Sequence, residues 1–489
     1  MTLEEILALE DIGQKVSLLQ KGRRTPMVNV SRLRDDWNPD RHEIMVDKEK
    51  YPKIKVVVEK EKKEWDGKTQ RDVTIPAKTK EVEPNRIAIP LEQDIVNIHT
   101  AFTVGTEPEM KCDPTDSEKG LYEALKSVLK KNKIKYQNRK IVRSWLSEQE
   151  VAEYWYVAKD DGFWAKLKAR VTSIFGNSRP EGKLKSVLWS PFRGDKLYPF
   201  FNDEGDLVAF SRGYKKRDAV GNETTCFMCI TAETVYNWAL TNNGWEDQGS
   251  FRHKFAKLPV IYSYRPEALC DKIRPIRIRL EKLLSGYADC IDYHFFPILM
   301  LFGDVKNFSG EFKNRVVELT GDGANAAYLT WNQASDPVKV ELDTYFNQAY
   351  ALTNTPRISF DQLKGTGTAL SGVAFRYVFM GAHMAVQNHA EELGLFMQRR
   401  VNFLVSGLGN INTHLESASK TIDVEVEIVP FMIDDIDDKV KTAVSAVQGG
   451  VWSRRDGVMF AGNAMRVDQT IAEIEEDHRK QAEKGAPQQ

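Results

Sequence analysis

The chain has 489 residues, and its 69 lysines and arginines nearly balance its 70 aspartates and glutamates, giving a formal net charge of -1. This balance excludes a polycation that binds DNA through its overall charge, so any electrostatic function must come from local arrangement. The length predicts two to four structural regions rather than one compact domain.

The isolated cysteines predict a protein of a reducing compartment, and the short apolar runs predict a soluble one. The five cysteines do not form a disulfide framework. The acidic start MTLEEILALE lacks the basic and apolar regions of a signal peptide. The longest apolar run, FFPILMLF at residues 295–302, is too short to cross a membrane. We therefore expect no membrane partner.

The first part of the chain predicts short helices and a hairpin. Thr2 and Glu5 have the spacing of a capping box, which predicts a short helix that ends near Gly22. Ile54–Glu59 and Asp72–Ile75 have strand composition, and an Asp-Gly turn lies between them.

Residues 89–268 complete an α+β body. Apolar positions at helical spacing predict a helix over residues 89–105 and further helix over 118–148. VAEYWYVAKDDG predicts a strand that ends in a turn. From Ser186 onward, short strand patterns separated by turn sequences predict an antiparallel meander.

Three helices are predicted after the body. RIRLEKLLSGYADCIDYHFF has a broad apolar stripe, and Pro297 and Gly303 end it. A polar, turn-rich insert follows, and then VKVELDTYFNQAYALTNTP predicts a second helix that Pro356 stops. A loop with two glycines leads into residues 371–405, which would form a helix of about 50 Å.

The C-terminal part predicts one strand and two helices. TIDVEVEIVP alternates apolar and polar residues, which predicts a half-exposed strand. KTAVSAVQGG predicts a helix that Gly449 caps, and VDQTIAEIEEDHRKQAEK predicts a charged final helix.

Catalytic motifs are absent from the sequence. There is no GxxxxGK[ST] loop, and GTGTALSG follows a polar segment and has no lysine at the position that phosphate binding needs. Ser371 lacks the GxSxG context of a hydrolase. We expect no enzymatic activity and no cofactor.

Three candidate metal sites each have a simpler interpretation. Cys226 and Cys229 have CxxC spacing, but no second pair completes a zinc site, so we interpret them as small residues in a strand. His383 and His389 lie six residues apart, so we interpret them as packing or solvent residues rather than ligands. The acidic run MIDDIDDK could bind a divalent ion, but a helix N-terminus stabilised by aspartates explains it more simply.

Several stretches, in this order, carry a resemblance to a known family. The stretches are NRIAIPLEQDIVNIHTAFTVGTEP, PIRIRLEKLLSGYADCIDYHFFPILMLFG, AAYLTWNQASDPVKVELDTYFNQAYALTNTPRIS, the cluster of Ser371, Gly372 and Ala374, IDVEVEIVPFMIDD, VWSRRDGVMFAG and VDQTIAEIEED. Together they resemble the portal proteins of tailed bacteriophages, the head-to-tail connectors. In one departure, Arg357 follows the proline where family members often carry an acid.

The resemblance implies a portal-type fold with named regions. They are an α/β wing at 1–268, a first stem helix at 269–303, a clip at 304–337, a second stem helix at 338–355, a tunnel loop at 356–370, a long helix at 371–405 and an α-rich crown at 406–489.

The resemblance also implies a function and partners. It implies a ring of probably twelve copies at one vertex of the virion, around a channel for double-stranded DNA during packaging, retention and ejection. The partners would be terminase, then a head-completion or adaptor protein, together with major capsid and scaffolding proteins. Assembly would take place in the host cytoplasm.

Candidate site residues follow from these regions. The tunnel-loop candidates for facing DNA are Arg357, Phe360, Asp361, Gln362, Lys364, Gly365 and Gly367, with the two glycines as hinges. In the stem, Arg277, Arg279 and Lys282 could face DNA or a neighbouring subunit. In the clip, Tyr328 and Trp331 could contact partner proteins or pack within the clip.

Two other functions remain open from the sequence. One is a nucleic-acid-processing enzyme of a mobile element, which would need clustered carboxylates that bind metal ions. The other is an oligomeric scaffold that forms no channel.

Overall fold

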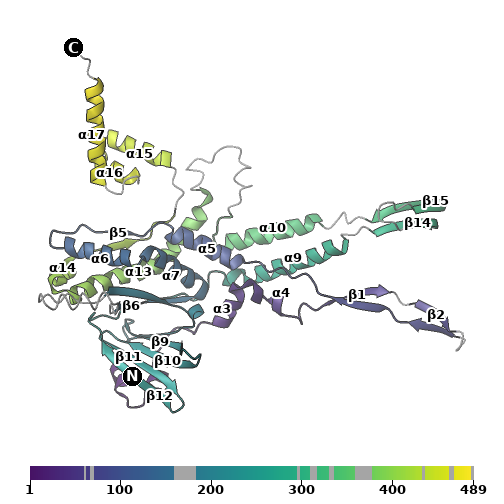
Figure 1. The fold of residues 1–489 in the computed structure, drawn as a ribbon, viewed down its shortest axis with the longest axis horizontal. Helices are drawn as coiled ribbons and strands as arrows, with labels where there is room; N and C mark the ends of the chain where they lie inside the picture. The colour runs from purple at the N-terminus through teal and green to yellow at the C-terminus, as the bar shows by residue number, and fades with distance from the viewer. Residues whose placement is uncertain are drawn as a thin grey trace.

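A computed structural model describes most of the chain. The described residues are 1–59, 62–66, 71–158, 183–294, 298–308, 317–329, 335–357, 377–431, 436–461 and 467–485. They contain both helices and antiparallel sheets, which confirms the predicted α+β class. Figure 1 shows a globular body from which elongated elements project on one side and a C-terminal group of helices on another.

The helical core of the body is formed by α5 (Leu91–Val104), α6 (Lys119–Lys131), α7 (Ile134–Glu148) and the middle of α13 (Met380–Ile411). These helices match the predicted ones over 89–105 and 118–148. Their apolar faces share the largest buried cluster, which includes Ile95, Leu125, Ile141, Leu146, Phe396 and Leu404.

Two antiparallel sheets complete the body. β6 (Glu150–Ala158) lies between β7 (Lys183–Trp189) and β13 (Val260–Tyr264) in one of them. The other has five strands in the order β12-β11-β10-β9-β8, the predicted meander. Its strands are β8 (Lys196–Phe201), β9 (Leu207–Arg217), β10 (Glu223–Ile230), β11 (Thr234–Thr241) and β12 (Gly244–Arg252). The strand around Ser186, predicted as the first strand of the meander, instead belongs to the three-stranded sheet.

Two N-terminal helices cover one face of the meander sheet. α1 (Leu3–Ala8) has the predicted capping box between Thr2 and Glu5. The helical pattern that follows is a separate helix, α2 (Ile12–Lys21), because Asp11 caps a new start. Ile6 and Leu19 pack against the sheet through Phe227, Trp238 and neighbouring side chains. Short helices α3 (Val30–Trp37) and α4 (Glu43–Val46) lead from there to the base of the projecting elements.

A long hairpin projects from the body after α4 (Figure 1). Its strands are β1 (Ile54–Glu59), β2 (Lys62–Asp66), β3 (Arg71–Ile75) and β4 (Lys78–Val82). β1 pairs with β4, and β2 pairs with β3. The two predicted arms are therefore not each other's partners, because each pairs with a strand that the sequence pattern did not reveal.

Paired helices and a second hairpin project beside the first (Figure 1). α9 (Arg274–His294) and α10 (Ser335–Leu352) run side by side. They lead to and from a hairpin of β14 (Ile298–Phe308) and β15 (Val317–Leu329). The predicted helical segment 269–303 is thus too long, since its last residues form part of β14. Branched and aromatic residues such as Ile298 and Phe302 suit an extended strand.

The long helix extends further than its pattern indicated. The described part of α13 ends at Ile411 rather than near residue 405, and residues 371–376 lie outside the described ranges. Gly407 and Gly409 lie inside the helix instead of ending it. A side chain at Gly409 would collide with Ser419 of α14 (Glu416–Thr421), so the glycine permits close helix packing there.

The C-terminal segment leaves the body after a short strand. β16 (Glu425–Glu427) pairs with β5 (Glu109–Lys111), which confirms a strand within TIDVEVEIVP. The last helices are α15 (Ile436–Gln448), α16 (Arg454–Ala461) and α17 (Val467–Gly485).

Candidate functional site

The paired helices α9 and α10 contact each other through charged side chains on their exposed faces. Arg279 donates from Nη2 and Nε to Glu341 Oε1 at 2.6 and 3.0 Å, and its side chain is 46% exposed. Lys282, one turn further along α9, is exposed. The charge of Arg279 is therefore largely neutralised within the subunit.

The end of α10 is fixed to the body by polar contacts. Tyr350 Oη donates to Asp94 Oδ2 of α5 at 2.7 Å. Burial raises the pKa of the Tyr350 phenol, and the hydrogen bond to Asp94 raises it further. The tyrosine therefore remains a neutral donor.

Arg357 folds back onto α10. Its Nη1 donates to Asn347 Oδ1 at 2.7 Å, its Nη2 lies 3.5 Å from Asp343 Oδ1, and its guanidinium lies 5.7 Å from the centroid of the Phe346 ring. Of the tunnel-loop candidates, only Arg357 is described. Phe360, Asp361, Gln362, Lys364, Gly365 and Gly367 lie outside the described residues.

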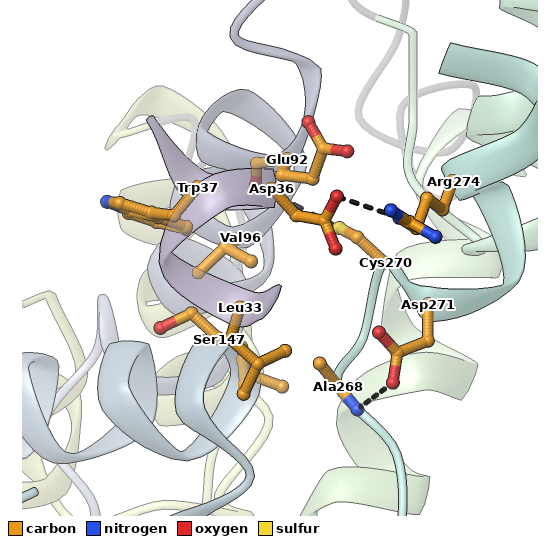
Figure 2. Close-up of a pocket in the computed structure, with 11 residues that line it drawn as sticks. Leu33, Asp36, Trp37, Glu92, Val96, Ser147, Ala268, Cys270, Asp271 and Arg274 are labelled. Atoms are coloured by element: carbon orange, nitrogen blue, oxygen red, sulfur yellow. Dashed lines mark hydrogen bonds and ion pairs between the residues drawn. The ribbon is translucent and has the colours of Figure 1, made fainter. Parts of the chain in front are cut away.

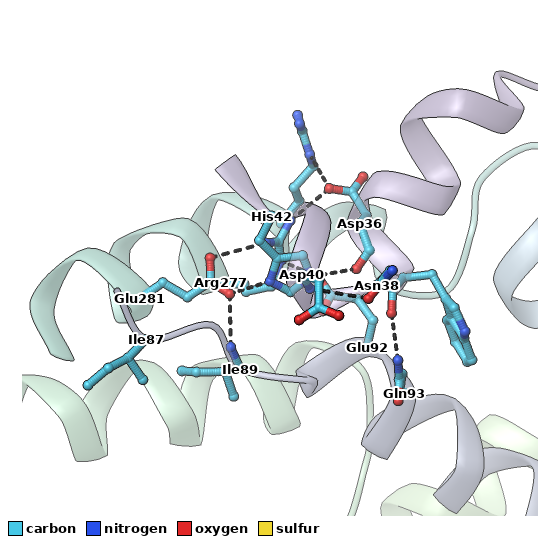
Figure 3. A network of polar contacts seen from close by, with 12 residues as sticks. Asp36, Asn38, Asp40, His42, Ile87, Ile89, Glu92, Gln93, Arg277 and Glu281 are labelled. Atoms are coloured by element: carbon cyan, nitrogen blue, oxygen red, sulfur yellow. Dashed lines mark hydrogen bonds and ion pairs between the residues drawn. The ribbon is translucent and has the colours of Figure 1, made fainter. Parts of the chain in front are cut away.

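A buried ion cluster holds the base of α9 to the body, as Figure 3 shows. Arg277 is 2% exposed, and its Nη2 donates to Asp36 Oδ1 at 2.7 Å and its Nη1 to Glu281 Oε2 at 3.2 Å. His42 Nδ1 lies 2.5 Å from Glu281 Oε1, which also accepts from the Ile89 backbone N–H. We call these residues, together with Glu92 and Arg274, the stem anchor.

Glu92 is the least satisfied member of the stem anchor. Its Oε1 lies 2.5 Å from Arg277 Nε, but neither of its side-chain oxygens has an aligned hydrogen-bond donor. Burial raises the pKa of this carboxyl to about 7, although Arg277 opposes the shift. Glu92 thus gains or loses a proton near neutral pH.

A small cavity lies beside the stem anchor (Figure 2), where Asp36 receives a hydrogen bond from Arg274 at 2.8 Å. Its volume of about 20 Å³ is enough for about one water molecule. Cys270 lines it, and burial raises the pKa of this thiol well above its usual value, so the thiol is unreactive. The cavity is therefore too small for a ligand larger than a water molecule.

Of the three stem candidates, Arg279 and Lys282 are exposed, whereas Arg277 is buried. Three carboxylates of its own chain surround Arg277, so its side chain does not lie on the surface of the subunit, where the prediction needs it. This corrects the prediction for that residue. Tyr328 lies in β15 opposite Leu299, and Trp331 lies outside the described residues.

A histidine pair under α13 is a feature that the sequence did not indicate. His99 Nδ1 lies 3.0 Å from His389 Nε2, and His99 Nε2 lies 2.9 Å from Thr355 Oγ1. Burial lowers the pKa of His99 to about 4 and that of His389 to about 2, so both rings are neutral. His389 is a packing residue, as predicted.

The structure describes the Cys226–Cys229 candidate fully and the acidic run only in part. Cys226 and Cys229 are buried in β10, which confirms their interpretation as strand residues. The MIDDIDDK run falls partly on residues 432–435, which are not described. Across the described ranges, no three or more histidines, cysteines or acids gather in a group that could hold a metal ion.

The comparison with known families decides the classification. The family described as phage portal protein, SPP1 Gp6-like, matches residues 31–484. The chain belongs to this family. It is thus a bacteriophage portal protein, a head-to-tail connector that takes part in capsid assembly, and a ring around a channel is typical of its family. No curated protein matches the chain.

The family match can be compared with the order of the elongated elements along the portal protein's chain. In the described parts of the chain, no helix is both long and apolar enough to cross a lipid bilayer. The paired helices, the hairpin at their end and the segment after Arg357 occupy the places in the chain order that the family resemblance assigns to stem, clip and tunnel loop.

Proposed function

We propose that this portal protein forms a ring, probably of twelve copies, whose central channel passes double-stranded DNA during packaging, retention and ejection. The family match over residues 31–484 carries the proposal. The rod-like pair of α9 and α10, which projects from the body and ends in a hairpin, suits the wall of such a channel.

The charge of the stem supports passage of DNA rather than tight binding. Arg279 pairs with Glu341, and Asp289 and Asp292 of α9 accept hydrogen bonds from Asn85. A wall with many free cations would hold phosphates, since each phosphate contact adds salt-dependent affinity. Because Arg279 is paired and the carboxylates of Asp289 and Asp292 repel phosphate, the stem wall would instead let the duplex slide.

In this proposal the named regions keep the boundaries given by the resemblance, apart from the first stem helix and the start of the clip. The first stem helix would be α9 itself, and the clip would begin with β14 at Ile298. The clip would dock terminase during packaging and a head-completion or adaptor protein afterwards. The wing and crown would meet major capsid and scaffolding proteins, and the ring would be built in the host cytoplasm and remain in the virion.

Negative-stain imaging of the purified protein tests the ring directly. We expect annular particles with a central hole. Compact dimers, or a monomer under all conditions, would refute the proposal. The protein is also expected to leave DNA uncut in a magnesium-dependent cleavage assay, which separates a portal from a nuclease.

A further inference from the structure

A pocket lies on the body where α6, α7, α13 and the small β5–β16 sheet meet. In Figure 1 these elements lie on the side of the body away from the projecting helices α9 and α10. The pocket's volume of about 430 Å³ falls in the range of ligand-binding pockets. None of the stem, clip or tunnel-loop candidates lines it. The site therefore shares no lining residue with the proposed stem, clip and tunnel-loop candidates.

The floor of this site is apolar. Leu129, Met397 and Val401 are buried at its base, and Met110, Ile134 and Val426 are half-buried around them. An apolar floor in an open pocket gains free energy when apolar groups of a ligand cover it.

The rim of the site is basic. Lys126, Lys130, Lys133 and Lys135 line it, and all four side chains are exposed. The turn between α6 and α7, where Lys133 adopts a left-handed conformation with φ 52°, places lysines from both helices on one rim. Two of the four lysines have an acidic neighbour: Glu107 Oε1 lies 3.5 Å from Lys135 Nζ, and Glu123 Oε1 lies 3.4 Å from Lys126 Nζ. Lys130 and Lys133 form no ion pair with the described residues and supply the excess positive charge.

The arginine at the floor does not add to this excess charge. Arg400 donates from Nε to Glu153 Oε2 at 2.6 Å and from Nη1 to Asn138 Oδ1 at 2.7 Å. Its charge is therefore neutralised inside the body, and the positive potential of the site comes from the exposed lysines.

An apolar floor beside a rim of lysines favours some anionic ligands over others. A DNA duplex would present phosphates to the lysines, but it has no apolar side chains to enter the floor. A small inorganic anion would likewise leave the floor uncovered. A peptide that carries both carboxylates and apolar side chains complements the rim and the floor together.

We propose that this site docks an acidic peptide segment of a partner protein, with apolar side chains on the floor and carboxylates at the lysine rim. The inference goes beyond the channel function and does not depend on ring formation.

Fluorescence anisotropy with the full-length protein tests the proposal. The probe is a short labelled peptide that alternates leucine with glutamate. We expect it to bind, and to bind more weakly as salt rises, because the rim contacts are exposed. The double variant Lys130→Glu with Lys133→Glu should weaken binding at least about tenfold, because two attractive rim charges become repulsive.

A matched control uses lysines of the same helices that do not line the site. Lys131 in α6 and Lys140 in α7 are exposed, so Lys131→Glu with Lys140→Glu makes the same change in net charge. This variant should bind the peptide as the unmodified protein does. A second probe, in which serine replaces leucine, should bind at least about tenfold more weakly, since it cannot cover the floor.

Several results would overturn the inference. They are no binding of the leucine–glutamate peptide, equal loss in the control variant, equal binding of the serine probe, or equal competition by a short DNA duplex. Imaging the same samples separates the two proposals, because annular particles that do not bind the peptide would refute this inference alone.

Discussion

The charge of Arg277 lies in the interior of the body. How much it contributes to the free energy of unfolding depends on the carboxylates that pair with it. Removing one member of a buried ion cluster typically costs about 3–5 kcal/mol, because the remaining charges stay buried without compensation. We expect Arg277→Met to lower the free energy of unfolding by this amount in urea denaturation. Arg279→Met is the control: its exposed pair with Glu341 should contribute about 1 kcal/mol or less.

The raised pKa of Glu92 makes stability depend on pH. The folded protein holds a proton on this carboxyl up to about pH 7, whereas the unfolded chain releases it near the ordinary value of 4.5. The stabilising contribution is therefore full below pH 4.5 and is lost as the pH rises through 7.

Glu92→Gln should remove this pH dependence. We expect the difference in unfolding free energy between the variant and the unmodified protein to change between pH 4.5 and 7 and to be constant above that window. Denaturation curves at several pH values measure it. A difference that does not change across the window would show that Glu92 is ionised throughout.

The partners of these residues could not be predicted from the sequence. Asp36 and Arg277 lie 241 positions apart, and His42 and Glu281 lie 239 apart. The apolar stripe of α9 could be recognised in the sequence because apolar side chains recur at a helical period. An arginine on that helix has no such signal, since its burial depends on which distant carboxylates the fold brings to it.

At the scale of elements, local patterns predicted helices and strands well but not their partners. α5, α7 and α9 follow from apolar spacing, because each helix buries one face. β7 has the same alternation as the meander strands, so only long-range packing assigns it to another sheet. The long helix was predicted to end at residue 405, yet it continues through Gly407 to Ile411, and a Cβ at Gly407 would lie only 3.3 Å from the Phe255 ring.

Two helical glycines should respond in opposite ways to alanine. Gly286 in α9 has open space around it, so Gly286→Ala should raise stability by about 0.5–1 kcal/mol through better helix propensity. Gly409→Ala should lower it by about 1–3 kcal/mol, because the methyl group would collide with Ser419. Thermal unfolding of the two variants compares them directly.

The proposed hinges of the tunnel loop form a separate prediction. Gly365→Ala with Gly367→Ala should restrict the backbone and impair DNA packaging while rings still form. A packaging assay with imaging of the rings measures both. Normal packaging by this variant would contradict the hinge role.

At the scale of the whole molecule, one helix face is left uncovered by the part of the chain that the structure describes. Tyr377, Met380 and Met384 recur at helical spacing at the start of the long helix and are 74%, 56% and 55% exposed. Exposed apolar stripes of this kind usually lie at interfaces. In a ring, we expect a neighbouring copy to cover this stripe.

Met384→Lys should therefore reduce the fraction of protein in rings. A lysine in an apolar interface carries a desolvation cost that a surface lysine does not. Met27→Lys, at a methionine that is 50% exposed and lies outside the long helix, is the control and should leave assembly unchanged. Mass measurement of both variants in solution reports the ring fraction, and equal fractions would place the stripe outside the interface.

The stem anchor also restricts how α9 can move relative to the body. Charge-assisted hydrogen bonds weaken steeply with distance and angle, so they tolerate little displacement. Arg274 and Arg277 both bind Asp36, and so the root of α9 cannot tilt without breaking several bonds together. A lateral force on the β14–β15 hairpin would therefore be transmitted to the body, and any bending would have to occur within α9 and α10.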